Sequence, residues 1–330
     1  MNFSKRQRCA LLMLLPKEEI LTKTQQLLEN HTPLWRHWQV YISRQLDLGK
    51  SPITLQSAQS SIRILMRRTP LCSIEQANDP CFISDQLAEL QRDYNLSACT
   101  RNTYLKNLNG YMIWLEKRGL IQHNNLRKAE RATQTIREQP CLTKSEIDRV
   151  ITYLQNYAFQ YKLEKSRNLL FVTLLAYTGA RKCELLDMHW EDVFQEFGEW
   201  KIRVSGRKQK ARVRYYNCPE AIISYYKKYM HLRGMKKYTC PKLFVSVRTG
   251  SPWTSSGVNR FYKRVYLGTG VRFSGHRVRR YVATRLDREG LSLHKISRYL
   301  GHQRISTTEL YITRSGSLTE DGGVIMEKLL

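Results

Sequence analysis

The 330-residue sequence lacks the short patterns by which metal and disulfide sites are usually recognised. Its eight cysteines are scattered with no CxxC pair among them, and its eight histidines include no HxxxH pair. This spacing argues against a zinc site and against a disulfide framework, so we expect no metal and no other cofactor. Thiols left unpaired are typical of a reducing cytoplasm.

Long apolar runs are also missing. The run Cys9–Leu15 is seven residues long, lacks a small-residue cleavage site and is followed by Pro16 and Lys17. We therefore interpret it as part of a helical leader over residues 1–31 and not as a signal peptide. No other stretch approaches transmembrane length, so we expect no membrane partner.

Acidic residues are scarce. The sequence has 28 Asp and Glu against 55 Lys and Arg, which gives a net charge of +27. Such an excess is typical of a protein that binds a polyanion, most often nucleic acid, and a ribosomal-type basic protein is the alternative. The length is sufficient for two domains, each with its own core.

Apolar residues at helical spacing predict an all-helical domain over residues 32–120. Four amphipathic helices fit this stretch, the last running from Thr100 to Lys117 with Gly119 after it. Arg101 and Lys106 of that helix are candidate nucleic-acid contacts, with a solvated helix face as the alternative. Residues 121–140 are polar and almost without apolar periodicity, which predicts an interdomain linker.

A second domain is predicted over residues 141–314, where a capping box at Thr143 and Glu146 opens a helix. A nearly all-apolar helix over 168–177 follows and ends before Gly179. Alternating residues over 200–216 predict a β-hairpin with a basic tip. A later helix over 255–267 carries two further candidate nucleic-acid contacts, Arg260 and Lys263.

The stretch Ser274–Ile312 gathers residues suited to a phosphodiester. His276 and Arg279 stand at i and i+3, so a helix places them on one face. Leu300-Gly301-His302 comes next, and Tyr311 lies nine residues beyond that histidine. Arginine clamps anions, imidazole moves protons, and a tyrosine can act as a covalent nucleophile.

This ordered set resembles the signature of the tyrosine recombinase (phage integrase) family. TGARKCE at 178–184 is similar to the family's first arginine motif, and HxxR, LGH and the final tyrosine complete the resemblance. The resemblance implies a mainly α fold with a small β-hairpin or sheet. It also implies a two-domain clamp around DNA, in which the all-helical core-binding domain joins a mixed α+β catalytic domain.

The resemblance assigns a role to each residue of the set. Tyr311 attacks the scissile phosphate and forms a 3′-phosphotyrosyl bond, and His276 accepts its proton. Arg181 and Arg279 bind the non-bridging oxygens, and His302 hydrogen-bonds the same phosphate. Glu184, three residues after Arg181, is expected to hold that guanidinium in orientation.

The basic tip of the hairpin departs from the family pattern. The family places a lysine there as general acid for the leaving 5′ oxygen, but Arg207 occupies the first lysine's slot. An arginine is a poor proton donor because it stays charged. Lys208 is therefore our first candidate for the acid, Lys210 the second, and Arg207 a candidate DNA contact.

The resemblance implies a site-specific recombinase that needs neither metal nor ATP and exchanges strands through a Holliday junction. Its partners would be double-stranded DNA and a homo-tetramer on two sites, alone or with a partner recombinase or accessory protein. The alternatives are a type IB topoisomerase-like enzyme and a non-catalytic DNA-binding member of the fold. The tail at 315–330 either docks on a neighbouring protomer or lies on its own domain. We expect a cytoplasmic, nucleoid-associated enzyme of DNA integration, excision or resolution, such as a mobile element encodes.

Overall fold

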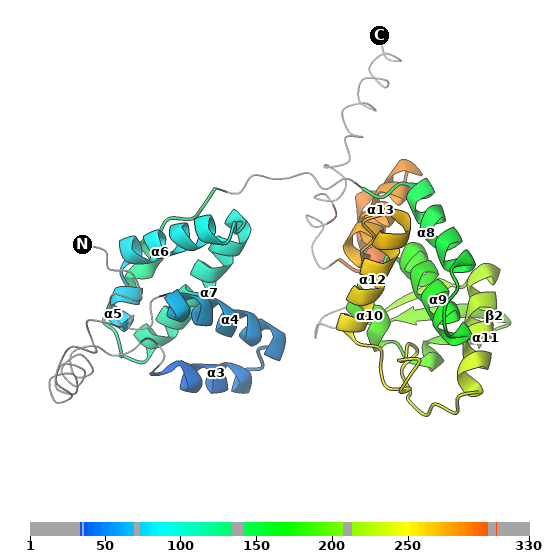
Figure 1. Ribbon diagram of the computed structural model, residues 1–330, viewed down its shortest axis with the longest axis horizontal. Helices are drawn as coiled ribbons and strands as arrows, with labels where there is room; N and C mark the ends of the chain where they lie inside the picture. Colours follow the sequence, from blue (N-terminus) through cyan, green and yellow to red (C-terminus); the bar gives the residue numbers. More distant parts are fainter. Residues whose placement is uncertain are drawn as a thin grey trace, which may run out of the picture. The chain divides into compact units, whose positions relative to one another are not determined.

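The computed structural model describes Leu34 and residues 36–68, 73–133, 141–206, 213–302 and 308. The chain forms two compact units, Met1–Arg137 and Glu138–Leu330, which are described separately (Figure 1). None of the described helices is long and apolar enough to cross a membrane.

The described secondary-structure elements of the first unit are all helices. Its elements are α3 (Trp38–Asp47), α4 (Pro52–Arg68), α5 (Ile74–Ala77), α6 (Pro80–Asp93), α7 (Ala98–Lys117) and the 3-10 helix η1 (Asn125–Lys128). The long helix α7 packs against α3, α4, α6 and η1. Its apolar face is fully buried at Leu108, Tyr111 and Met112, and the ring of Tyr111 lies 5.0 Å from that of Trp38.

Two boundaries of the first unit differ from the sequence prediction. Helix α7 begins at Ala98 and not at Thr100, because the Ser97 hydroxyl accepts the backbone N–H of Thr100 and caps the helix two residues earlier. The expected linker at 121–140 begins with residues that pack on this unit. Leu126 is 2% exposed there, and Asn102 exchanges two hydrogen bonds with the backbone of Ala132.

The second unit is built around a buried helix. Its elements are α8 (Lys144–Asn156), α9 (Lys162–Thr178), α10 (Lys182–Asp187), η2 (Trp190–Asp192), β1 (Val193–Glu196), β2 (Glu199–Val204), β3 (Arg214–Asn217), α11 (Glu220–Gly234), α12 (Ser255–Thr269), α13 (Gly275–Arg288) and α14 (Leu293–Leu300). Helix α9 is the apolar helix of the sequence, and α8, α10, α11 and α13 pack around it (Figure 1). The capping box of Thr143 and Glu146 opens α8 as predicted.

A three-stranded antiparallel sheet in the order β1-β2-β3 contains the predicted hairpin. Strand β1 was not predicted, because its four residues are too few to show an alternating pattern. The burial of β3 alternates along the strand. Arg214 and Tyr216 are buried while Val213 and Tyr215 are exposed, because a carboxylate inside the unit receives the Arg214 guanidinium.

Two glycines set the loops on which the functional residues lie. Gly179 ends α9 at φ +59° and Gly301 ends α14 at φ +67°, both in the left-handed region. A Cβ on Gly179 would lie 2.5 Å from Cδ2 of Leu300. The two helix ends therefore approach each other more closely than any other residue at position 179 would permit.

Candidate active site

The first cation of the site follows directly from the end of the buried helix α9. Arg181 stands at the N-cap of α10, and its Nη1 donates to Oε1 of Glu184 over 2.8 Å. Its backbone N–H donates to Oε2 of the same carboxylate over 2.9 Å. The Arg181 side chain is 38% exposed whereas that of Glu184 is 3% exposed. The Glu184 carboxylate thus holds one side of the Arg181 guanidinium, and the other side faces solvent.

The second cation, Arg279, lies on α13 and is 1% exposed. It donates through Nη1 to the carbonyl oxygen of Gly179 over 2.9 Å and through Nη2 to that of Leu300 over 2.6 Å. Its Nε donates to Nε2 of His302 over 3.2 Å. None of these three acceptors carries a negative charge, and together they fix the orientation of the guanidinium.

His302 is also held on both sides of its ring. Burial, together with the charge of Arg279, lowers the pKa of His302 to about 3, so the imidazole is neutral at physiological pH. Because Nε2 accepts from Arg279, this hydrogen-bond network assigns the proton to Nδ1, which lies 2.7 Å from Oγ1 of Thr308. In this arrangement His302 supports Arg279, and contact with a phosphate would require the imidazole to turn.

His276 occupies the first turn of α13 and is exposed. Desolvation lowers the pKa of His276 below its ordinary value. Three nearby cations lower it further: Arg279, Arg181 and Lys182. The lowered pKa keeps the imidazole neutral near pH 7, and the neutral form is the one that can act as a general base.

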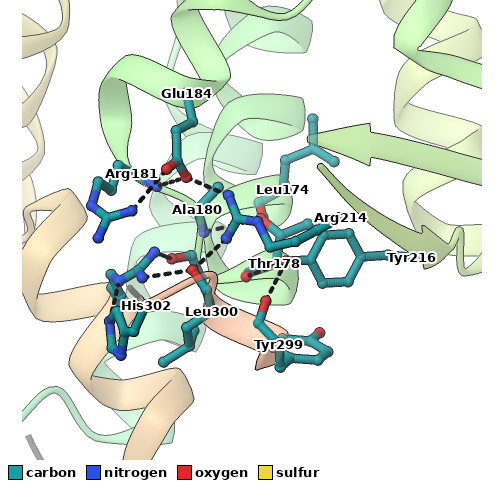
Figure 2. Close-up of polar contacts among 12 residues, drawn as sticks. Leu174, Thr178, Ala180, Arg181, Glu184, Arg214, Tyr216, Tyr299, Leu300 and His302 are labelled. Carbon is teal, nitrogen blue, oxygen red and sulfur yellow. Dashed lines mark hydrogen bonds and ion pairs between the residues drawn. The ribbon is translucent and has the colours of Figure 1, made fainter. Parts of the chain in front are cut away.

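A further arginine, which the sequence analysis missed, connects these groups from the sheet side. Arg214 is 6% exposed and donates through Nη2 to Oε2 of Glu184 and through Nη1 to the carbonyl of Leu300, each over 2.5 Å. Figure 2 shows it between Glu184 and Leu300, beside Arg181. Burial alone would raise the pKa of Glu184, but Arg214 and Arg181 together hold it below its ordinary value.

The structure therefore brings Arg181, Glu184, Arg279 and His302 together, with His276 beside their charges. Four other predicted site residues lie outside the residues that the structure describes, and they stay predictions: Arg207, Lys208, Lys210 and Tyr311.

The candidate nucleic-acid contacts also stay predictions. Lys106, Arg260 and Lys263 are exposed, as such contacts must be. Arg101 is half-buried, and its Nη2 donates to the carbonyl of Ser84 over 3.5 Å.

Comparison with known proteins identifies the family of the chain. The model of the phage integrase family matches residues 140–316, which is more than half of the chain. The chain belongs to the phage integrase family. As a tyrosine recombinase it is an enzyme of a class that cleaves and rejoins DNA. The observed fold, mainly helical with a small antiparallel sheet, is the one predicted.

Relatives and solved structures of the integrase family cover most of the chain. A tyrosine recombinase of Thermosipho africanus is 28% identical over 216 residues, which are 64% of this chain and 71% of that protein. The tyrosine recombinase XerD of Chlamydia trachomatis is 23% identical over 287 residues, which are 85% of this chain and 91% of that protein. The fold is similar to that of a lambda integrase dimer bound to a COC′ core site, with a TM-score of 0.66 and 18% identity. That match covers 90% of this chain and 81% of the integrase.

Proposed function

We propose that this chain is a site-specific DNA recombinase that cuts and rejoins DNA through a 3′-phosphotyrosyl intermediate and exchanges strands through a Holliday junction. The observation that carries the proposal is the pair Arg181 and Arg279, each fixed by hydrogen bonds at the edge of one site. Two guanidiniums beside neutral imidazoles suit the two non-bridging oxygens of a phosphodiester, whose charge grows in the transition state.

The bond changes follow from the roles of the named groups. The phenolic oxygen of Tyr311 attacks phosphorus, and its proton passes to the neutral His276. The bond from phosphorus to the 5′ oxygen breaks, and Lys208 or Lys210 gives that oxygen a proton, which leaves a 5′ hydroxyl. Attack of a 5′ hydroxyl on the phosphotyrosyl bond reverses the sequence and restores the phosphodiester, so no ATP is consumed.

A bridging 5′-sulfur substrate tests the two lysines. A thiolate leaves without protonation, whereas an alkoxide needs a general acid. We therefore expect Lys208→Ala to cut the ordinary substrate slowly and the 5′-thio substrate at the wild-type rate, with Lys210→Ala as its matched control. The reverse pattern would assign the acid to Lys210. If both variants cleave both substrates slowly, neither lysine of this hairpin is the general acid.

Strand exchange implies several copies of the chain on two duplexes. The relatives named above are recombinases, and one solved relative is a dimer on its DNA site. On this basis we propose a tetramer on two sites, alone or with a partner protein, with residues 315–330 in contact with a neighbouring copy. A topoisomerase-like enzyme is not favoured, because the named relatives are recombinases.

An assay with two products tests this function. Duplexes carrying a site selected from a random library by the purified chain would be incubated in pairs, and recombinant duplexes would be scored on a gel. A supercoiled plasmid without the site serves as the control substrate. We expect recombinant duplexes and little relaxation of the plasmid. Relaxation without recombinants would favour the topoisomerase-like reading, and binding without either product would favour a non-catalytic protein.

A further inference from the structure

Arg214 is a charged residue on the face of the sheet that packs against the core. It opens β3 and pairs with Val204 of β2, which is fully buried. Arg214 itself is 6% exposed, whereas Val213 before it is 48% exposed. Burying a guanidinium costs several kcal/mol unless it is paired, so the two acceptors of Arg214 are what permit this placement.

Each acceptor of Arg214 is shared with one of the two phosphate-binding arginines. Oε2 of Glu184 receives Nη2 of Arg214 over 2.5 Å and the backbone N–H of Arg181 over 2.9 Å, and Oε1 receives the Arg181 guanidinium. The Leu300 carbonyl receives Nη1 of Arg214 over 2.5 Å and Nη2 of Arg279 over 2.6 Å. Arg214 thus bridges the partner of one arginine to the partner of the other (Figure 2).

The backbone around Arg214 is shaped to admit it. A Cβ on Gly301 would lie 2.9 Å from Nε of Arg214, so the glycine leaves space for the guanidinium between β3 and the end of α14. Two residues along β3, the hydroxyl of Tyr216 donates to the carbonyl of Tyr299 over 2.6 Å. The strand therefore holds the last turn of α14 at two points, next to His302.

We propose that Arg214 is a positioning residue for this site, which sets Arg181 and Arg279 in fixed relation to each other. The inference rests on the proposed function, because it assumes that both arginines bind the scissile phosphate. Arg214 acts through Glu184 and through Leu300 without contact to the substrate. Loss of its charge then has two effects, on geometry and on the ionisation of Glu184.

The effect on the ionisation of Glu184 changes the pH dependence of cleavage, which a loss of packing alone would not do. Arg214 supplies the attractive charge that lowers the pKa of this buried carboxylate most, and hydrogen bonds from Arg181 lower it further. Across a cavity beside Glu184 lie four further charged or titratable groups: Asp187, His189, Asp192 and Arg203. Two of these are acidic, and Arg203 pairs with one of them, Asp192, over 2.6 Å. With Arg214 neutralised, the pKa of Glu184 rises, and its carboxylate is lost as pH falls through the new value.

The test compares two substitutions at one position. Arg214→Lys keeps the charge but cannot reach both acceptors at once, and Arg214→Met removes the charge. Both would be measured in the full-length chain for DNA binding, thermal unfolding and single-turnover cleavage of a nicked duplex carrying the selected site, from pH 5 to 9. Arg233→Met is the matched control, because Arg233 is 3% exposed in the same unit and donates to backbone carbonyls away from the site.

We expect both Arg214 variants to bind DNA as the wild type does and to cleave it about 10²-fold more slowly at pH 8, since small displacements of catalytic groups cost that much. In Arg214→Met alone, the fall in cleavage at low pH should begin at higher pH than in the wild type. The acid limb should not move when Arg214→Met is introduced into the Glu184→Gln variant and the double variant is compared with Glu184→Gln alone.

Three results would overturn the inference. The first is that both Arg214 variants cleave at the wild-type rate. The second is that Arg233→Met, at an equal loss of stability, loses as much cleavage rate as the Arg214 variants. The third is that the acid limb of the pH–rate profile does not move in Arg214→Met. If Arg214→Met does not fold, Arg214→Lys against Arg233→Met decides the question by rate alone. Wild-type protein that forms no covalent adduct would instead refute the proposed function, so the two failures are distinguishable.

Discussion

Gly179→Ala perturbs the contact between the ends of α9 and α14, on which the arginine site depends. The new methyl group would lie 2.5 Å from Cδ2 of Leu300 and 3.2 Å from Cγ1 of Val282. Leu300 is fully buried and cannot turn into solvent. Its carbonyl accepts from Arg279, and the carbonyl of Gly179 does so as well. We therefore expect the substitution to displace two acceptors of Arg279.

The magnitude has two parts. Holding a residue other than glycine at φ +59° costs about 1–2 kcal/mol. Forcing a methyl group into a filled core costs about 1–3 kcal/mol more. We expect Gly179→Ala to lower the free energy of unfolding by about 2–5 kcal/mol, and cleavage of the selected site by the folded fraction to slow about 10²-fold.

Gly290→Ala is the matched control. Gly290 follows α13 at φ +81°, but a Cβ there meets nothing within 4 Å. It carries the same backbone cost of about 1–2 kcal/mol without the clash, and cleavage by the folded fraction should be unchanged. Urea unfolding curves and single-turnover cleavage of both variants check the prediction. Equal loss of stability in the two variants, or wild-type cleavage in Gly179→Ala, would refute the reasoning.

Three further predictions follow from the charges of the site and of the helical unit. Because the pKa of His276 is lowered, wild-type cleavage should fall only below about pH 6.5, and His276→Gln should lack this acid limb in a pH–rate profile. His302 has a pKa of about 3 when folded, so below pH 6.5 the unfolded chain binds a proton that the folded chain does not. Stability should therefore drop by about 2 kcal/mol between pH 7 and pH 5 in urea titrations, and by less in His302→Gln. Lys106→Gln should reduce the slope of log K against log salt by about 1 in a binding assay, and an unchanged slope would remove Lys106 from the interface.

Much of the architecture could be predicted from periodicity and from helix-ending residues. The helix predicted over 255–267 is observed as α12 at Ser255–Thr269. Helix α9 was recognised from its apolar character on every face. The pair Arg181 and Glu184 was expected from its spacing of three residues and is observed at 2.8 Å. These features depend on short-range rules that a sequence displays directly.

The features that the sequence analysis missed depend on long-range partners. Arg214 reads as an outward-facing charge, because nothing within β3 indicates that Glu184, 30 residues earlier, lies opposite it. The use of His302 to support Arg279 is likewise invisible, since it depends on a contact between residues 23 apart in the chain. A buried cation is revealed by the acceptors around it, and these come together only in the fold.

The measurement that tests the central claim most directly is covalent capture of cleaved DNA on the chain. A nicked duplex carrying the selected site loses a short fragment after cleavage, so the phosphotyrosyl adduct cannot religate and accumulates on a denaturing gel. We expect the wild-type chain to form the adduct, with the attached nucleotide on the peptide that contains Tyr311, and Tyr311→Phe to bind the same DNA without forming it. An adduct of equal yield in Tyr311→Phe, or attachment at a different tyrosine, would contradict the account.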